Sequence, residues 1–91
     1  MSYEIQYSEE AEEDLAKYKK SNPIAYKKVY RLIPELINHP RHGTGHPEPL
    51  VSGDNITYSR RISKKDRIVY DIYDDIVAVL IISVERHYSD K

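Results

Sequence analysis

Apolar and polar residues alternate in parts of the chain and recur with helical spacing in others. Residues 3–7 (YEIQY) alternate, which predicts a short, half-buried strand. Ser8 then offers a helix cap, and Asn22-Pro23 ends that helix and starts another. The apolar spacing predicts the inward positions of these two helices, which are Ala11, Leu15 and Tyr18 in the first and Val29, Leu32, Ile33 and Leu36 in the second.

The second half of the chain has the pattern of a β-sheet. Alternating and β-branched residues predict three strands, over about residues 55–62, 67–72 and 76–85. The last of them (IVAVLIISV) is apolar on both faces, so we expect it to be central and buried. Residues 39–54, rich in Pro, Gly and His, predict a long loop. The order β-α-α-β-β-β indicates a single α+β domain over 1–91, a mainly antiparallel sheet with two helices packed on one face.

Strand register makes a specific prediction about two arginines. Aligning the apolar faces of the first two of these strands requires Tyr58 to face Tyr70, because a slip of one residue would turn an apolar set outward. That register places Arg61 directly opposite Arg67. Facing like charges destabilise a sheet by roughly 0.2–1 kcal/mol. Either an anion lies between the two guanidiniums, or both extend apart into solvent.

Charge is distributed unevenly along the chain. The net charge is only −1, yet residues 16–67 contain twelve of the 14 lysines and arginines and only four acids. A basic middle segment is typical of a surface that contacts phosphates, although helix-dipole effects account for the acidic start. The chain has no cysteine and no long apolar run. We therefore expect a cytoplasmic protein without disulfides or a membrane-spanning segment.

Several side chains suit acid–base chemistry. Glu48 lies between Pro47 and Pro49, which limit the backbone around its carboxylate, although a loop glutamate is commonly only a surface charge. His87 and Tyr88 follow the last predicted strand, and a histidine exchanges protons near neutral pH. Together with the paired arginines, an acid and a base could cleave a phosphodiester next to a ribose 2′-hydroxyl.

A metal site is not predicted. The histidines of the loop are His39, His42 and His46, and the prolines and glycines among them exclude a shared helical face. No cysteine or second nearby carboxylate completes a ligand set. We expect neither a metal nor another cofactor.

Four segments together resemble one family of bacterial toxins. They are GTGHPEPL (Gly43–Leu50), YSRRI (Tyr58–Ile62), DRIVY (Asp66–Tyr70) and RHY (Arg86–Tyr88). In order and spacing they resemble the YoeB/Txe branch of the RelE superfamily over nearly the whole chain. The resemblance implies a microbial-RNase-like α+β fold. It also implies the toxin half of a type II toxin–antitoxin module, an endoribonuclease that cuts mRNA in the ribosomal A site.

The resemblance also implies residue roles. Glu48 would be the general base, Arg61 and Arg67 would stabilise the phosphate, His87 would be the general acid and Tyr88 would orient the substrate. Arg60 would contribute either to structure or to RNA docking. The branch tends to carry lysines where Thr44 and His46 stand here, so we expect either weaker docking to the ribosome or docking through Lys27, Lys28, Lys64 and Lys65 instead. His46 is a further candidate for contact with RNA.

Partners and alternatives complete the expectations. The implied partners are a cognate antitoxin, the ribosome with its mRNA, and a second copy of the chain. One alternative is a toxin of the same superfamily that poisons DNA gyrase by binding, without cleaving RNA. Another is a plain interaction module. Neither alternative needs both an acid and a base, whereas the sequence supplies Glu48 and His87.

Overall fold

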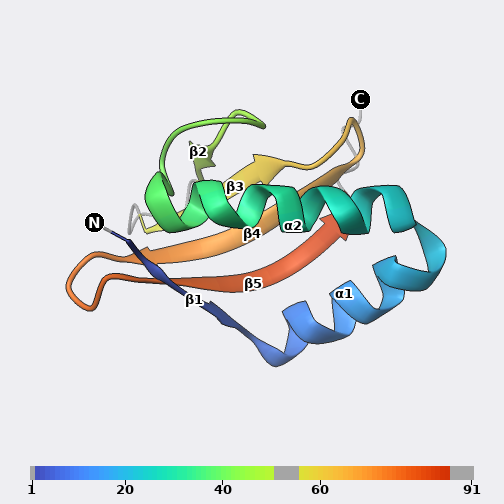
Figure 1. The fold of residues 1–91 in the computed structure, drawn as a ribbon, viewed down its shortest axis with the longest axis horizontal. Coiled ribbons are helices and arrows are strands. Elements are labelled where there is room, and N and C mark those ends of the chain that lie inside the picture. The colour runs from blue at the N-terminus through green and yellow to red at the C-terminus, as the bar shows by residue number, and fades with distance from the viewer. Residues whose placement is uncertain (1, 51–55, 87–91) are drawn as a thin grey trace.

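The computed structural model describes residues 2–50 and 56–86 (Figure 1). Its elements are β1 (Glu4–Tyr7), α1 (Glu9–Ser21), α2 (Pro23–Asn38), β2 (Glu48–Pro49), β3 (Thr57–Arg61), β4 (Asp66–Tyr73) and β5 (Ala78–Arg86). These elements confirm the predicted α+β class and the two helices. No helix among the described residues is long and apolar enough to cross a membrane.

Both helices begin at the predicted caps. The Ser8 hydroxyl oxygen accepts a hydrogen bond from the Ala11 amide at 3.0 Å. The Asn22 side-chain oxygen accepts one from the Ala25 amide at 3.3 Å, and Pro23 occupies the first turn of α2. The caps satisfy amide groups that have no partner within the helix.

The five strands form one mixed sheet in the order β1-β5-β4-β3-β2. β1 pairs parallel to β5, and all other neighbours are antiparallel. Two expectations need correction. The segment 39–54 is not all loop, because Glu48 and Pro49 pair with β3 as a short edge strand. The last strand, β5, lies inside the sheet as predicted, but β4 is the middle strand.

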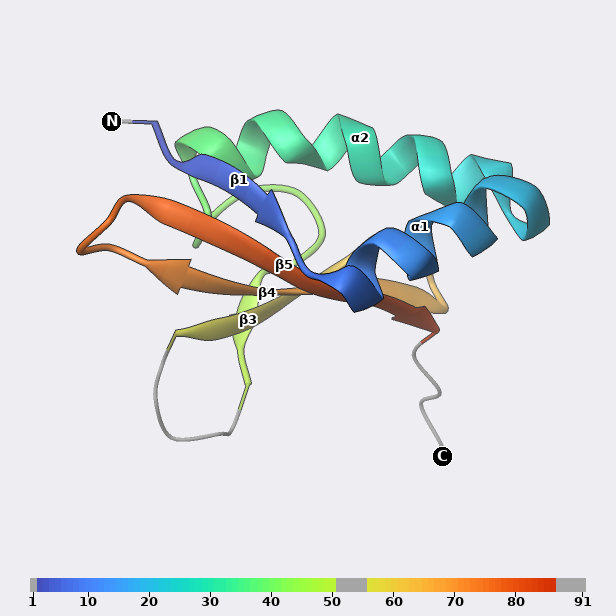
Figure 2. The same ribbon diagram turned by 90° about the horizontal axis from the view of Figure 1, so that it is seen from below.

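The helices lie on the same side of the sheet, as predicted (Figure 2). The core between the two layers is made of aliphatic side chains from both helices and from β4 and β5, with Tyr70 as its fully buried aromatic ring; it includes Ala11, Leu15, Val29, Leu36, Ile68, Tyr70, Ile72, Val79 and Ile81. Side chains alternate along β3. Tyr58, Arg60 and Ile62 therefore point toward the helices, whereas Ser59 and Arg61 point to the other face.

The predicted β3–β4 register is confirmed. Tyr58 faces Tyr70 and Arg61 faces Arg67. The two tyrosine rings stack with their centroids 6.3 Å apart and their planes inclined by 23°. Because the apolar set of each strand is buried under α2, the polar residues between them, Arg61 and Arg67, must emerge together on the opposite face.

The packing of α2 on the sheet yields a stability prediction. Leu36 is fully buried, whereas Ile24 on the same helix is 72% exposed. Leu36→Ala is expected to lower the free energy of unfolding by about 2–5 kcal/mol, because it removes buried methyl groups and leaves a cavity. Ile24→Ala, the control, should change it by less than about 0.5 kcal/mol. Urea unfolding followed by circular dichroism measures both; equal effects would contradict this packing.

Candidate active site

Strand β2 brings the acid of the Pro-Glu-Pro segment, Glu48, to the face of the sheet that carries the arginines. Glu48 pairs directly with Ser59, and Arg61 lies two residues farther along the same face of β3. Arg67 is opposite Arg61 on β4. The side chains around this point enclose a hollow of about 70 Å³, which we call the polar hollow; it is lined by His46, Glu48, Ser59, Arg61, Ser63, Lys64, Asp66 and Arg67.

Arg67 has an anionic partner within the chain. Its Nε and Nη2 donate to one carboxylate oxygen of Glu85, at 3.1 and 2.9 Å. Glu85 lies on β5, directly across from Arg67. Both side chains are partly exposed, so the ion pair contributes little to stability, but it orients the guanidinium. The anion expected near the two arginines is thus in part supplied by the protein itself.

The structure brings together several of the residues singled out by sequence. Glu48, Arg61, Arg67, His46 and Lys64 all line the polar hollow. Lys65 is exposed in the adjoining β3–β4 turn, whereas Lys27 and Lys28 are exposed on α2 and lie outside the hollow. The expected sites at His87 and Tyr88 lie outside the described residues.

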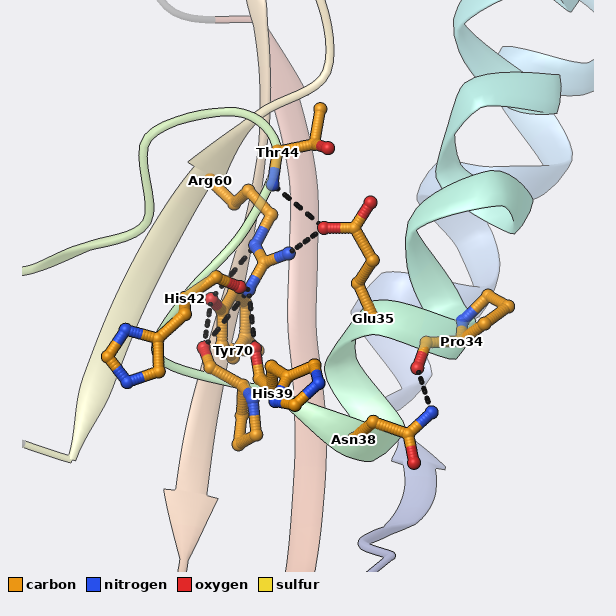
Figure 3. A network of polar contacts seen from close by, with 9 residues as sticks. Pro34, Glu35, Asn38, His39, His42, Thr44, Arg60 and Tyr70 are labelled. Carbon is orange, nitrogen blue, oxygen red and sulfur yellow. Dashed lines mark hydrogen bonds and ion pairs between the residues drawn. The ribbon is translucent and has the colours of Figure 1, made fainter.

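The structure places Arg60 in the interior, so its position gives no support to the alternative of RNA docking. Its side chain is fully buried between the sheet and α2. Nε donates to the Tyr70 hydroxyl at 3.3 Å, and Nη1 donates to Glu35 Oε1 at 3.0 Å (Figure 3). The structural role, which the sequence left open, is the one that these contacts describe.

The second terminal nitrogen of Arg60 holds the loop that follows α2. Nη2 donates to the carbonyl oxygens of His39, Pro40 and His42, at 3.0, 3.3 and 2.8 Å (Figure 3). The Tyr70 hydroxyl donates to the Pro40 carbonyl as well, at 2.7 Å. A buried guanidinium needs several acceptors to offset its lost hydration, and here three of them are backbone groups of one loop.

The same loop is fixed a few residues later. The Thr44 amide donates to Glu35 Oε1 at 2.8 Å, and the Arg61 amide donates to the Gly45 carbonyl at 2.7 Å. Gly45 has a φ of +88°, and a Cβ there would collide with the Arg61 carbonyl oxygen and the Arg60 side chain. Glycine is therefore required at this position for the loop to approach β3 closely. These contacts lead the chain directly into His46 and Glu48.

Glu35 remains ionised over a wider pH range than an isolated carboxyl. The Thr44 amide is the main cause of its lowered pKa, and Arg60 contributes; together they outweigh partial burial, which raises it. The carboxylate thus keeps an opposite charge beside the buried guanidinium.

Sequence reasoning missed three residues of this region. Glu85 could have been found from the β4–β5 pairing, but a shift in register between Val69 and Tyr70 breaks simple counting along the hairpin. Ser59 could not be linked to Glu48 from the sequence, because β2 was not predicted. Glu35, the third, lies in a helix far along the chain from Arg60, and no local pattern links the two.

The polar hollow brings a carboxylate close to guanidinium groups. Among residues 2–50 and 56–86, no three His, Cys, Asp or Glu side chains are grouped as a metal ion would require. The hollow instead combines one carboxylate from an edge strand with guanidiniums from the two neighbouring strands. Such an arrangement can take up a proton next to a bound phosphate.

Comparison with known proteins gives the family. Residues 7–88 match the model of the YoeB-like toxin of bacterial type II toxin–antitoxin systems. The chain belongs to the YoeB family. Toxin YoeB of Escherichia coli K12 is 34% identical over 82 residues, which are 90% of this chain and 95% of that protein. Toxin YoeB of Streptomyces coelicolor is 32% identical over 84 residues, or 92% of this chain and 98% of that one.

Solved structures of YoeB proteins share the fold. The YoeB dimer from Staphylococcus aureus is 31% identical, with a TM-score of 0.81 over 97% of this chain and 100% of that one. A YoeB/ParE toxin from Agrobacterium tumefaciens is 25% identical, with a TM-score of 0.83; the match covers 93% of this chain and 99% of that one. The present chain is thus a YoeB-family toxin of the type II toxin–antitoxin class along almost its whole length.

The contribution of the buried Arg60 guanidinium to stability in this YoeB-family toxin can be measured by comparison with the exposed Arg61. Arg60→Lys is expected to lower the free energy of unfolding by about 2–4 kcal/mol, because an ammonium cannot reach Tyr70, Glu35 and the loop carbonyls at once. Arg61→Lys is the matched control, the same change on the exposed face, and should cost less than about 0.5 kcal/mol. Chemical denaturation measures both; similar losses would contradict the assigned burial.

The lowered pKa of Glu35 predicts that the stability of the protein depends on pH. Because its pKa is lowered in the fold, the carboxylate stabilises the protein above its unfolded-state pKa of about 4.3, and this stabilisation is lost as pH falls through the folded-state value. Glu35→Gln should therefore lower the free energy of unfolding at pH 7 and have a smaller effect at pH 3. Urea unfolding at both pH values measures this. Glu13→Gln, which removes an exposed carboxylate of α1, is the control; an effect of Glu35→Gln equal at both pH values would refute the prediction.

Proposed function

We propose that this chain is a ribosome-dependent endoribonuclease that cleaves mRNA in the ribosomal A site without a metal ion. The observation that carries the proposal is that Glu48, Arg61 and Arg67, from three adjacent strands, line one hollow. Membership of the YoeB toxin family supports it. Residues 1–91 act as one toxin domain in this proposal.

The reaction follows from the charges in the hollow. The Glu48 carboxylate removes the proton of a ribose 2′-hydroxyl, and the 2′ oxygen attacks the adjacent phosphorus. Arg61 and Arg67 stabilise the negative charge that develops on the phosphoryl oxygens. The bond from phosphorus to the 5′ oxygen breaks, and a general acid protonates that oxygen. The products are a 2′,3′-cyclic phosphate and a 5′-hydroxyl end.

The Arg67–Glu85 ion pair adds a step to this scheme. A phosphate that binds Arg67 through Nε and Nη2 must compete with Glu85, which engages both nitrogens. A phosphate that binds through Nη1 can share the guanidinium with Glu85, because arginine has five N–H donors. The general acid is proposed to be His87 and the substrate-orienting residue Tyr88, from the family resemblance, at positions outside the described residues.

Docking and partners belong to the same proposal. His46, Lys64 and Lys65 lie in or next to the polar hollow and would contact RNA near the cleavage point, with Lys27 and Lys28 farther away on α2. Staphylococcus aureus YoeB has been crystallised as a dimer and in complexes with YefM. By analogy we assign this chain a cognate antitoxin, a homodimeric state and a cytoplasmic location.

The decisive substitution is Glu48→Gln, which keeps the shape of the side chain but removes the base. It is expected to reduce ribosome-dependent cleavage by about 10²–10⁴-fold, the usual contribution of a general base. Primer extension on mRNA with and without 70S ribosomes measures the cleavage, and the 5′-hydroxyl end is identified by its need for phosphorylation before ligation. Toxicity on induction should fall in parallel.

Glu13→Gln, an exposed change on α1, is the matched control and should cleave at the wild-type rate. Circular dichroism establishes that each variant is folded. Equal cleavage rates for Glu48→Gln and the wild type would refute the proposed role of Glu48 as the general base. Toxicity with intact mRNA and with accumulation of gyrase-linked DNA breaks would instead indicate the binding alternative.

A further inference from the structure

A second hollow, distinct from the polar hollow, lies between α2 and the sheet. It has a volume of about 300 Å³, and we call it the α2 groove; its lining residues are Lys28, Arg31, Leu32, Glu35, Thr44, Arg61 and Ile62. They come from the helix, from the loop that Arg60 holds, and from the end of β3 (Figure 1). The groove therefore depends on the same loop anchoring as the polar hollow.

The charge of the α2 groove is positive. Lys28, Arg31 and Arg61 are exposed cations, and within residues 2–50 and 56–86 none of them forms an ion pair. The one acid of the lining, Glu35, is engaged by the buried guanidinium of Arg60 and by the Thr44 amide. Lys28 and Arg31 bring two cations to this groove from α2, and neither forms an ion pair within the described residues, which favours an anionic ligand.

Part of the lining of the α2 groove is aliphatic. Leu32 and Ile62 contribute to it, and both are largely buried. Ligand pockets commonly pair apolar lining residues with a few charged groups, and about 300 Å³ is at the small end of their range. A nucleobase could contact the aliphatic residues while its phosphate contacts the cations.

Arg61 connects the two hollows. It lines the polar hollow together with Glu48 and Arg67, and it lines the α2 groove together with Lys28 and Arg31. A chain of nucleotides whose phosphate binds Arg61 in one hollow therefore has its next unit beside the other. A lone phosphate or a globular anion would not use both.

We propose that the α2 groove binds a nucleotide of single-stranded RNA next to the one cleaved in the polar hollow, with Lys28 and Arg31 holding its phosphate. This assignment rests on the proposed function and deepens it, since it extends the substrate contact beyond the scissile linkage. Arg31 and Thr44 then become part of the RNA surface, although the sequence pattern did not mark them. The groove contributes affinity and not chemistry.

The test uses RNA that cannot be cleaved, so that binding is measured apart from catalysis. The probe is a fluorescein-labelled single-stranded hexanucleotide with 2′-O-methyl groups on every ribose, and fluorescence anisotropy gives its Kd at several salt concentrations. The double variant Lys28→Gln/Arg31→Gln is expected to bind about tenfold more weakly. The slope of log Kd against log salt should fall by about 0.7, because the two cations together neutralise one phosphate of a single strand.

The control is Lys19→Gln/Lys20→Gln, which removes the same charge from the end of α1. It should keep the wild-type Kd within about twofold, and circular dichroism establishes that both variants are folded. Equal Kd values for the two double variants, or no RNA binding by the wild type, would overturn the assignment. Groove-dependent binding of poly-L-glutamate without groove-dependent binding of RNA would also overturn it, in favour of an acidic protein segment.

The outcome is independent of the cleavage experiment. If RNA binding depends on Lys28 and Arg31 but the protein does not cleave mRNA on ribosomes, the proposed RNA groove is supported and the proposed nuclease activity is refuted. If cleavage depends on Glu48 but RNA binding does not depend on Lys28 and Arg31, the nuclease activity is supported and the proposed RNA groove is refuted.

Discussion

The guanidinium of Arg60 connects the three parts of the molecule on which the candidate site depends. Buried between β3 and α2, it donates to a helix carboxylate, to a core tyrosine and to three carbonyls of one loop. A charge in the interior is tolerated only when its donors are satisfied, so sheet, helix and loop must keep their relative positions. The loop is thus held by contacts with the core, in addition to the glycine that its own sequence supplies at position 45.

Two hollows use that anchoring. The loop leads through Gly45, against the Arg61 backbone, into β2, and the pairing of Glu48 with Ser59 then fixes the carboxylate on the arginine face. On its other side the loop supplies Thr44 to the groove beneath α2. The contacts of Arg60 on one face of β3 therefore help to position Glu48 beside the arginines on the opposite face. Sites supported in this way are preorganised, which lowers the cost of orienting the substrate.

The net charge of −1 conceals an uneven distribution of acids and bases along the chain. The acids of α1 lie in its first turns, where they complement the helix dipole. Two of the acids near arginines are engaged in ion pairs, Glu35 with Arg60 and Glu85 with Arg67. Lys28, Arg31 and Arg61 form no such pair within the described residues, and they surround the α2 groove.

The sequence alone determined the parts of this protein that rest on local periodicity: both helix caps, the two apolar helix faces, four of the five described strands, and the register that sets Arg61 opposite Arg67. These follow from rules acting over a few residues, because one slip would expose an apolar face. Only the tertiary structure decided that Arg60 is buried, that Glu48 belongs to an edge strand and that Glu85 pairs with Arg67. Each of these depends on segments distant in the chain, and the partner of a charged side chain is set by which backbone groups the fold places beside it.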